Sequence, residues 1–285
     1  EGFVQLYNGR GTYVRRKSVD RVIEEVLELG RNHPLRRVHF ADDLFVHHRK
    51  WLEEFSDRFR GEAGYAFTMN ASPERVDDEV ARLLAEAGCV GVALGLESGV
   101  RPRREEILGR RVTDEHIVEA AEAVRSRGMM LVTFNFLASP GETIDDAFAT
   151  VRMNREIRSD FQRLSVGDPI PGTPLSDRAA REELIDRPRV EIRRGSFMPA
   201  FKVDDPRAFA NLFELFRLAT RGEWWERVVR RLLQLPPNPL FRIFRILMLL
   251  GERRFFGLGW IESMRFGLSS AGPMRRTKLY NNYIP

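Results

Sequence analysis

Two hydrophobic periods alternate along the chain, and together they predict a series of strand-and-helix units. Short runs in which apolar residues occupy every second position end in polar residues or glycine, and a stretch with helical spacing follows each run. The predicted strands are 37–40, 65–70, 88–99, 130–138 and 161–167. The predicted helices cover about 18–30, 48–60, 76–87, 113–128 and 143–157. Strands separated by helices at these intervals are typical of a parallel α/β sheet.

The strand at 88–99 shows this pattern most clearly. Large apolar residues there alternate with Gly91, Ala93 and Gly95, and the small series ends in Glu97. We expect helices to cover the bulky face, so that the small face leaves room inside a curved sheet. The residues expected on the inner faces of the five strands are His39, Asp43, Ala66, Thr68, Asn70, Gly95, Glu97, Thr133, Asn135, Ser165 and Gly167. A small and polar interior suits an open barrel that encloses a polar ligand, because closed eight-stranded barrels fill their interior with branched apolar layers.

The first predicted element is a helix that has no strand before it. A parallel unit that starts on its crossover helix is expected to have its first strand upstream of Glu1, so we expect the chain to be a fragment. The pattern changes after residue 180. Residues 1–180 are expected to form the barrel, and residues 181–285 a mainly helical C-terminal region with a proline break at 236–239.

Composition narrows the class of protein. The chain of 285 residues is 43% hydrophobic and 31% charged, which is typical of a globular protein. The sequence has no run of eighteen apolar residues, so no membrane-spanning helix is expected. A single cysteine argues against a disulfide scaffold and favours the cytoplasm. The formal charge of +5 does not by itself indicate a nucleic-acid partner, because no groove pattern of aromatic and basic residues accompanies it.

Six short motifs occur in an order and spacing that resemble a known family. They are YVRRKSVD at 13–20, HFADDLF at 39–45, EAGC at 86–89, GLESG at 95–99, FLASPGET at 136–143 and PIPGTPL at 169–175. Over roughly residues 7–178, they resemble the radical S-adenosylmethionine (SAM) enzymes, in particular the branch with an N-terminal cobalamin-binding domain. The resemblance implies a partial (β/α)6 TIM-like barrel, here lacking its first strand, followed by the mainly helical C-terminal region.

The resemblance also implies cofactors and partners. The family binds SAM and a 4Fe–4S cluster held by a CxxxCxxC loop, and it cleaves SAM to a 5′-deoxyadenosyl radical; the resembled branch adds cobalamin. A small-molecule substrate and an electron donor such as flavodoxin or ferredoxin are implied as well. Such a cluster needs three thiolates, whereas this chain has only Cys89, which starts an apolar strand and is expected to be buried. We therefore expect the cysteine loop just upstream of Glu1 and expect the chain alone to be inactive.

Four residues at strand ends match positions that contact SAM in the resembled family. Asp42 and Asp43 follow the strand at 37–40, and the resemblance places one of them next to the amino group of SAM. Their alternative role is to cap the following helix. Glu97 and Ser98 end the strand at 88–99, where the resemblance implies contact with the ribose or the methionine part of SAM. The alternative for this pair is a solvated strand end.

Three further candidates lie on the later strands. Asn135 is expected to hydrogen-bond SAM or the substrate, and Gly167 and Pro169 are expected to lie against the adenine through backbone groups. An ordinary loop is the alternative for the last two. His47 and His48 are not expected to form a metal site, because adjacent residues on a helix do not face one ligand.

The leading hypothesis is therefore part of a radical SAM enzyme, of the iron–sulfur oxidoreductase or methyltransferase type. A radical SAM protein without cobalamin, and a cysteine-less barrel that binds SAM or a partner without turnover, are alternatives. An unrelated barrel lyase would carry phosphate-binding glycines after its last strand, where this sequence has a proline-rich turn. The segment 240–250 carries Arg242 and Arg245 among apolar residues, and packing on the barrel is favoured over contact with a membrane surface.

Overall fold

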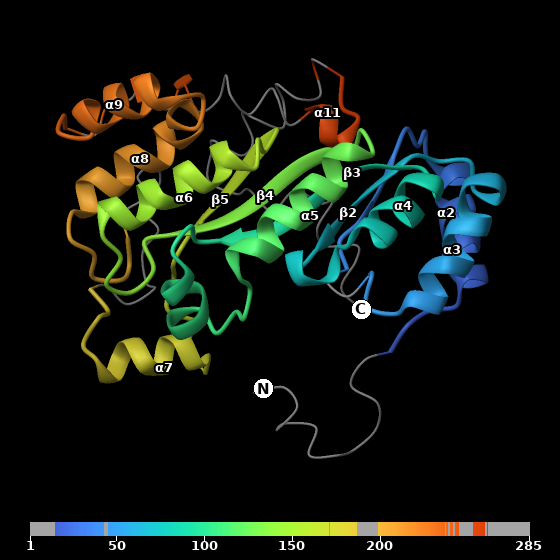
Figure 1. Ribbon diagram of the computed structural model, residues 1–285, viewed down its shortest axis with the longest axis horizontal. Helices are drawn as coiled ribbons and strands as arrows, with labels where there is room; N and C mark the ends of the chain where they lie inside the picture. Colours follow the sequence, from blue (N-terminus) through green and yellow to red (C-terminus); the bar gives the residue numbers. More distant parts are fainter. Residues whose placement is uncertain are drawn as a thin grey trace.

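The centre of the protein is a curved sheet of five parallel strands that neighbour one another in chain order. The computed structural model describes residues 15–42, 45–170, 172–186, 199–236, 238, 240–241, 243–244, 253–259 and 261. Helices lie along the outer face of the sheet, and further helices follow the last strand (Figure 1). This arrangement confirms the predicted partial barrel.

The five strands lie close to the predicted positions. Their bounds are β1 (Val38–Phe40), β2 (Phe67–Ala71), β3 (Cys89–Glu97), β4 (Met130–Leu137) and β5 (Phe161–Val166). Every bound is within two residues of the prediction. The register between β3 and β4 shifts at Gly95 and Glu97, which twists the carboxyl end of β3.

Helices connect the strands and cover their outer face. They are α2 (Val19–Asn32), α3 (Arg49–Glu62), α4 (Asp78–Glu86), α5 (Asp114–Ser126) and α6 (Ile144–Glu156). Four of them begin at a side chain that accepts a backbone N–H of the first turn, from Ser18, Asp77, Thr113 and Thr143. The residues next to each of these helix starts therefore determine where the helix begins. The observed starts agree with the predictions within two residues.

Three short elements were not predicted. They are the 3₁₀ turn η1 (Pro73–Arg75), the π-helical turn η2 (Arg103–Ile107) and the helix α7 (Pro174–Arg181). The sequence predicts only a turn at α7, because prolines dominate it. Thr173 nevertheless caps the helix and Pro174 occupies its first turn, where a missing N–H costs nothing.

The inner and outer faces agree with the prediction on β2 and β3. Met69, Val92 and Leu94 are buried in the core between the sheet and its helices. Thr68 pairs in register with Gly91 and Asn70 with Ala93, so these residues share the inner face. The small residues of β3 therefore do leave an interior.

On β4 the predicted faces are wrong. Thr133 and Asn135 point away from the interior, because the hydroxyl of Thr133 donates to the side-chain oxygen of Asn154 on α6 at 2.6 Å, and the Asn154 amide donates to Asn135 at 2.7 Å. The inner face carries Phe134 instead, which pairs in register with Gly95. A large ring fits inside the barrel there because the neighbouring strand has no side chain at that position. Bulk alone therefore does not mark the outer face.

Three helices of the C-terminal region are described, α8 (Pro206–Ala219), α9 (Glu223–Leu232) and α11 (Arg253–Phe256). Phe209 and Phe216 of α8 pack with Phe148 of α6 in one buried cluster, so this region extends the outer helical layer. In the described part of the chain, no helix combines the length and apolarity that a membrane crossing needs. Of the predicted segment 240–250, Arg242, Arg245 and residues 246–250 lie outside the described residues.

Candidate functional site

A cavity of about 530 Å³ opens at the carboxyl ends of the strands. Ligands of open parallel sheets bind at this edge, because the loops that follow the strands converge there. Asn70 from β2, Gly95 and Glu97 from β3, Phe134 from β4 and Ser165 from β5 line the cavity. Its volume is in the range of cofactor pockets.

Glu97 and Arg110 form the charged wall of this cavity. Glu97 ends β3 with φ of +63°, a left-handed conformation that is strained in a residue other than glycine and that clusters at functional sites. Arg110 reaches back from the loop after η2, and its Nη2 lies 3.4 Å from Oε1 of Glu97. The guanidinium lies over Gly95, where a Cβ would be 2.6 Å from Nη2. Gly95 therefore makes room for Arg110.

Two polar atoms at this cavity have unmet hydrogen-bonding capacity. The side-chain oxygen of Asn70 and the Nε of Arg110 are buried and have no hydrogen-bond partner in the described part of the chain. Buried polar atoms without a partner are rare and costly, and their presence at one cavity points to a ligand. Sequence reasoning missed Arg110 as a site residue, because nothing in the sequence separates it from Arg111 beside it.

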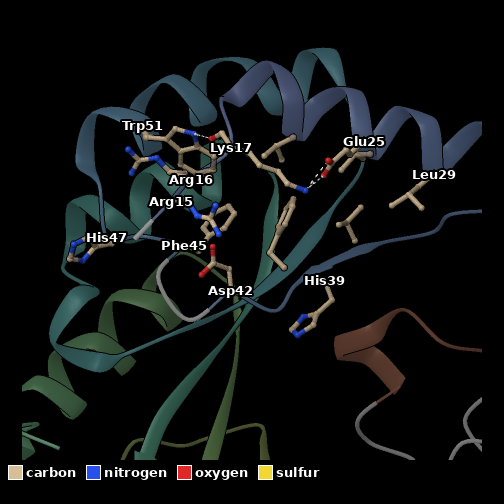
Figure 2. A pocket seen from close by; sticks show the side chains of 14 residues that line it. Arg15, Arg16, Lys17, Glu25, Leu29, His39, Asp42, Phe45, His47 and Trp51 are labelled. Carbon is tan, nitrogen blue, oxygen red and sulfur yellow. Dashed lines mark hydrogen bonds and ion pairs between the residues drawn. The ribbon is translucent and has the colours of Figure 1, made fainter. Parts of the chain in front are cut away.

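Asp42 lies at a second cavity of about 620 Å³, between α2 and the edge strand β1. Figure 2 shows this cavity, with Lys17 paired to Glu25 on one side and Asp42 pointing toward Arg15. His39 and His47 also line it, and His47 lines the first cavity as well. Asp43 lies outside the described residues.

The alternative role for Asp42 as the cap of the following helix is wrong. The residue that precedes the first turn of α3 is His48, and it makes no side-chain capping bond. Asp42 is exposed and follows the strand β1 directly. The carboxylate therefore lies at the carboxyl edge of the sheet, beside β1.

Ser98 and Asn135 are buried and are not among the residues that line the cavity. The Oγ of Ser98 accepts the N–H of Val100 at 3.2 Å, which stabilises the turn after β3. Asn135 is 1% exposed, and its amide group bonds to Thr133 and to the carbonyl of Arg163. The expectation that Asn135 faces the interior is wrong, because α6 offers it a polar partner on the outer face.

Gly167 and Pro169 are buried just after β5 and are not among the residues that line either cavity. The N–H of Gly167 donates to the carbonyl of Leu137 at 2.9 Å. A Cβ at Gly167 would be 2.8 Å from the carbonyl oxygen of Ala138 and 2.9 Å from the ring of Phe201. The absence of a side chain thus lets the carboxyl ends of β4 and β5 approach each other closely.

Glu142 holds the turn after β4. Its Oε2 accepts the N–H of Ser139 at 2.8 Å and the hydroxyl of Ser139 at 3.0 Å. Arg103 donates to the same hydroxyl at 2.8 Å and to the carbonyl of Pro140 at 2.6 Å. Burial raises the pKa of Glu142 to about 7, although its hydrogen bonds to Ser139 act in the opposite direction. The turn has an evident structural role.

Cys89 does not fit a cluster ligand. It is the single cysteine of the chain and is buried at the start of β3. Burial raises the pKa of its thiol to about 12, so the thiolate that binds iron is strongly disfavoured. The described residues contain no group of three histidine, cysteine or carboxylate side chains that could hold a metal ion, and this includes His47 and His48.

The comparison with protein families identifies the class. The radical SAM superfamily matches residues 6–153, more than half of the chain. The chain therefore belongs to the radical SAM superfamily, whose members use SAM and a 4Fe–4S cluster.

Two curated relatives are both methyltransferases by name. An uncharacterized methyltransferase of Pyrococcus horikoshii is 27% identical over 172 residues, which is 60% of this chain and 37% of that protein. Cytidylyl-2-hydroxyethylphosphonate methyltransferase of Streptomyces wedmorensis is 27% identical over 184 residues, 62% of this chain and 34% of that protein. The chain thus matches only about a third of the length of these relatives.

The solved structures of the radical SAM methyltransferase TsrM from Kitasatospora setae have a similar fold. The structure with cobalamin and a [4Fe–4S] cluster has a TM-score of 0.51 at 23% identity, over 64% of this chain and 34% of that one. The structure with tryptophan and a SAM analogue has a TM-score of 0.51 at 22% identity, over 67% of this chain and 37% of that one. The similarity supports the partial barrel fold.

Proposed function

We propose that this chain is the SAM-binding barrel of a radical SAM methyltransferase that works with cobalamin. The observation that carries the proposal is the cavity at the carboxyl ends of the strands, where Glu97 and Arg110 meet over Gly95. The family match and the two relatives named as methyltransferases support it.

Four polar or charged residues at or near the cavity match parts of SAM. The guanidinium of Arg110 binds the carboxylate, because its unmet Nε adds a donor to a group that prefers planar carboxylates. Glu97 accepts the ribose hydroxyls, as acidic residues do at strand ends in dinucleotide sites. The side-chain oxygen of Asn70 accepts from a donor of the ligand. Asp42 at the neighbouring strand pairs with the ammonium group.

The remaining predicted residues act differently. Ser98 shapes the turn that presents Glu97, and Gly167 and Pro169 bring the ends of β4 and β5 together near the adenine. Asn135 is left out of the proposed SAM site, because its side chain lies on the outer face against α6.

The described residues do not fit the iron–sulfur cluster, so the proposal requires cysteine ligands other than Cys89. When bound, the cluster supplies the electron that cleaves SAM, and cobalamin would carry the methyl group from a further domain. The proposal also includes a flavodoxin or ferredoxin as electron donor and a small molecule as methyl acceptor. It further places the protein in the cytoplasm and the domain division at residue 180.

A second candidate function is a SAM-binding barrel that performs no turnover. The observation that favours it is the burial of Cys89, which leaves the described chain without a thiolate for iron. The two candidates share the SAM cavity and differ in the cluster. Reconstitution of the complete protein with iron and sulfide separates them, since only the enzyme would show cluster absorbance and cleave SAM.

The test of the shared cavity is calorimetric titration with S-adenosylhomocysteine, which keeps the carboxylate, ribose and adenine of SAM. We expect the wild-type chain to bind and Arg110→Gln to bind at least tenfold more weakly. Arg111→Gln is the matched control, because Arg111 is the neighbouring arginine, is exposed and does not line the cavity. Equal affinities of the two variants, or no binding by the wild type, would contradict the proposed cavity.

A further inference from the structure

The amino-terminal end of the barrel is filled by residues that come long after its last strand. Phe255 of α11 is 1% exposed and packs with Ala93, Val132 and Phe161, one residue from each of three strands. Figure 1 shows α11 at the opposite end of the sheet from α7, which follows the carboxyl end of β5. The interior is therefore closed at one end by the C-terminal region.

The barrel is shaped to receive this helix. Gly91 on β3 makes space for Phe255, since a Cβ there would be 2.9 Å from the ring. Arg37, just before β1, donates to the carbonyl oxygens of Arg254 and Phe255, the latter at 2.6 Å. His39 lies with its ring 5.8 Å from that of Phe255 and 5.5 Å from that of Phe256, edge to face.

Arg163 connects the buried helix with the cavity above it. Its guanidinium carbon lies 5.3 Å from the ring of Phe134, 5.3 Å from Phe255 and 4.6 Å from Phe256. Cation–π attraction favours this position of the guanidinium between the rings. Because Phe134 lines the cavity, Phe134, Arg163 and the two rings of α11 form a stack from the cavity down to the amino-terminal end.

We propose that α11 is an internal plug that sets the depth of the acceptor cavity, with Phe255 and Phe256 as the specificity-determining residues. This inference rests on the proposed function, because it assumes that the acceptor enters over the carboxyl ends beside SAM. With the plug in place, the cavity ends at Phe134, and acceptors that reach below this ring are excluded. A second space of about 290 Å³ lies beside Phe256 and is lined by His39 and Thr68. Replacing Phe255 or Phe256 with a smaller residue would connect this space to the interior of the barrel.

The test measures access to the layer below Phe134 and needs neither SAM nor a cluster. In the full chain, Cys89→Ala with Ala93→Cys leaves one thiol on the inner face of β3, next to Phe255. The probe is 4,4′-dithiodipyridine, which reports release of 4-thiopyridone as the thiol reacts. We expect negligible labelling with the plug intact and at least a tenfold faster rate with Phe255→Ala. Gly91→Ala should also raise the rate, because it displaces the ring without changing α11.

Two further variants decide what a faster rate means. Ser165→Trp fills the cavity above, so it should slow labelling again if the reagent enters over the carboxyl ends. Phe209→Ala removes an equally buried ring from the α8 cluster and should leave the rate unchanged. Where Phe255→Ala does not melt cooperatively, Phe255→Leu replaces it. An unchanged rate in the plug variants, an equal increase with Phe209→Ala, or no effect of Ser165→Trp would overturn the plug.

The outcomes also separate this inference from the proposed function. Absence of S-adenosylhomocysteine binding by the wild type contradicts the proposed function, whatever the labelling rates. Binding of S-adenosylhomocysteine together with unchanged labelling contradicts the plug alone. If the labelling rates support the plug, a series of acceptors of increasing size extends the test in the complete enzyme. We expect the larger acceptors to react only after Phe255 or Phe256 is replaced by a smaller residue.

Discussion

The two ends of the barrel are built on different principles. The carboxyl end carries charges, a strained Glu97, and polar atoms of Asn70 and Arg110 that have no hydrogen-bond partner among the described residues. The amino end is filled with the rings of Phe255 and Phe256, and a glycine provides space for one of them. The carboxyl end is less stably packed and leaves room for a ligand, whereas the amino end stabilises the fold through the packing of its rings. Substitutions at the two ends should therefore separate stability from binding.

The largest effect is expected at the amino end. Phe255→Ala should lower the free energy of unfolding by about 3–5 kcal/mol, because it removes a fully buried ring and leaves a void that the strands cannot fill. Urea unfolding followed by circular dichroism measures this change. A loss below about 1 kcal/mol would mean that α11 is only loosely docked.

Glu142, at the carboxyl end, should make stability fall as pH rises. Its folded pKa of about 7 lies above its unfolded value, so folding retains a proton that the unfolded chain releases between about pH 4.5 and 7. Glu142→Gln should remove a loss of about 3 kcal/mol over this range. Unfolding curves at pH 5 and pH 7.5 test the sign, and a wild-type stability that rises more steeply than that of the variant would contradict it.

His39, at the amino end, should act in the opposite direction. Burial lowers its folded pKa to about 4, helped by the nearby Arg163, so the folded state binds fewer protons than the unfolded state between about pH 4 and 6.5. Stability is lost as pH falls through this range. Because His39 is only half-buried, we expect an effect of about 1.5 kcal/mol, less than the full shift implies. His39→Gln should flatten the acid side of the stability profile, measured in the Glu142→Gln background to remove the opposing slope.

The smallest effect on stability is expected at the cavity itself. Gly95→Ala would place a Cβ 2.6 Å from the end of Arg110, a flexible side chain that can move aside. We expect the affinity for S-adenosylhomocysteine to fall about fivefold, about 1 kcal/mol, with stability nearly unchanged. Titration calorimetry and urea unfolding of the same sample measure both. A large loss of stability with unchanged affinity would reverse the proposed roles of the two ends.

Local signals account for the parts of the fold that the sequence predicts. Strands with strict alternation and helices with capping residues such as Thr113 and Thr143 are specified within a few neighbouring residues. The face of β4 depends on Asn154, which comes from another element and offers a polar partner outside the barrel. Periodicity within one strand contains no information about that partner.

The candidate site was predictable only in part, for the same reason. Glu97 ends a recognisable strand, so its place at the edge of the sheet follows from the pattern. Arg110 returns to Glu97 from a loop that contains a π-helical turn, and no local pattern specifies this path. The docking of α11 joins residues separated by most of the chain, which local reasoning does not reach.

The hydrogen bond between Arg37 and α11 also affects the order in which parts of the protein fold. It joins residues 218 positions apart, so it forms only after nearly all of the described chain has been synthesised. Ribosomes make the strands first, and domains fold as their residues emerge. A nascent barrel therefore passes through an open-ended stage, in which water and small molecules reach its interior from both sides, before α11 packs into it.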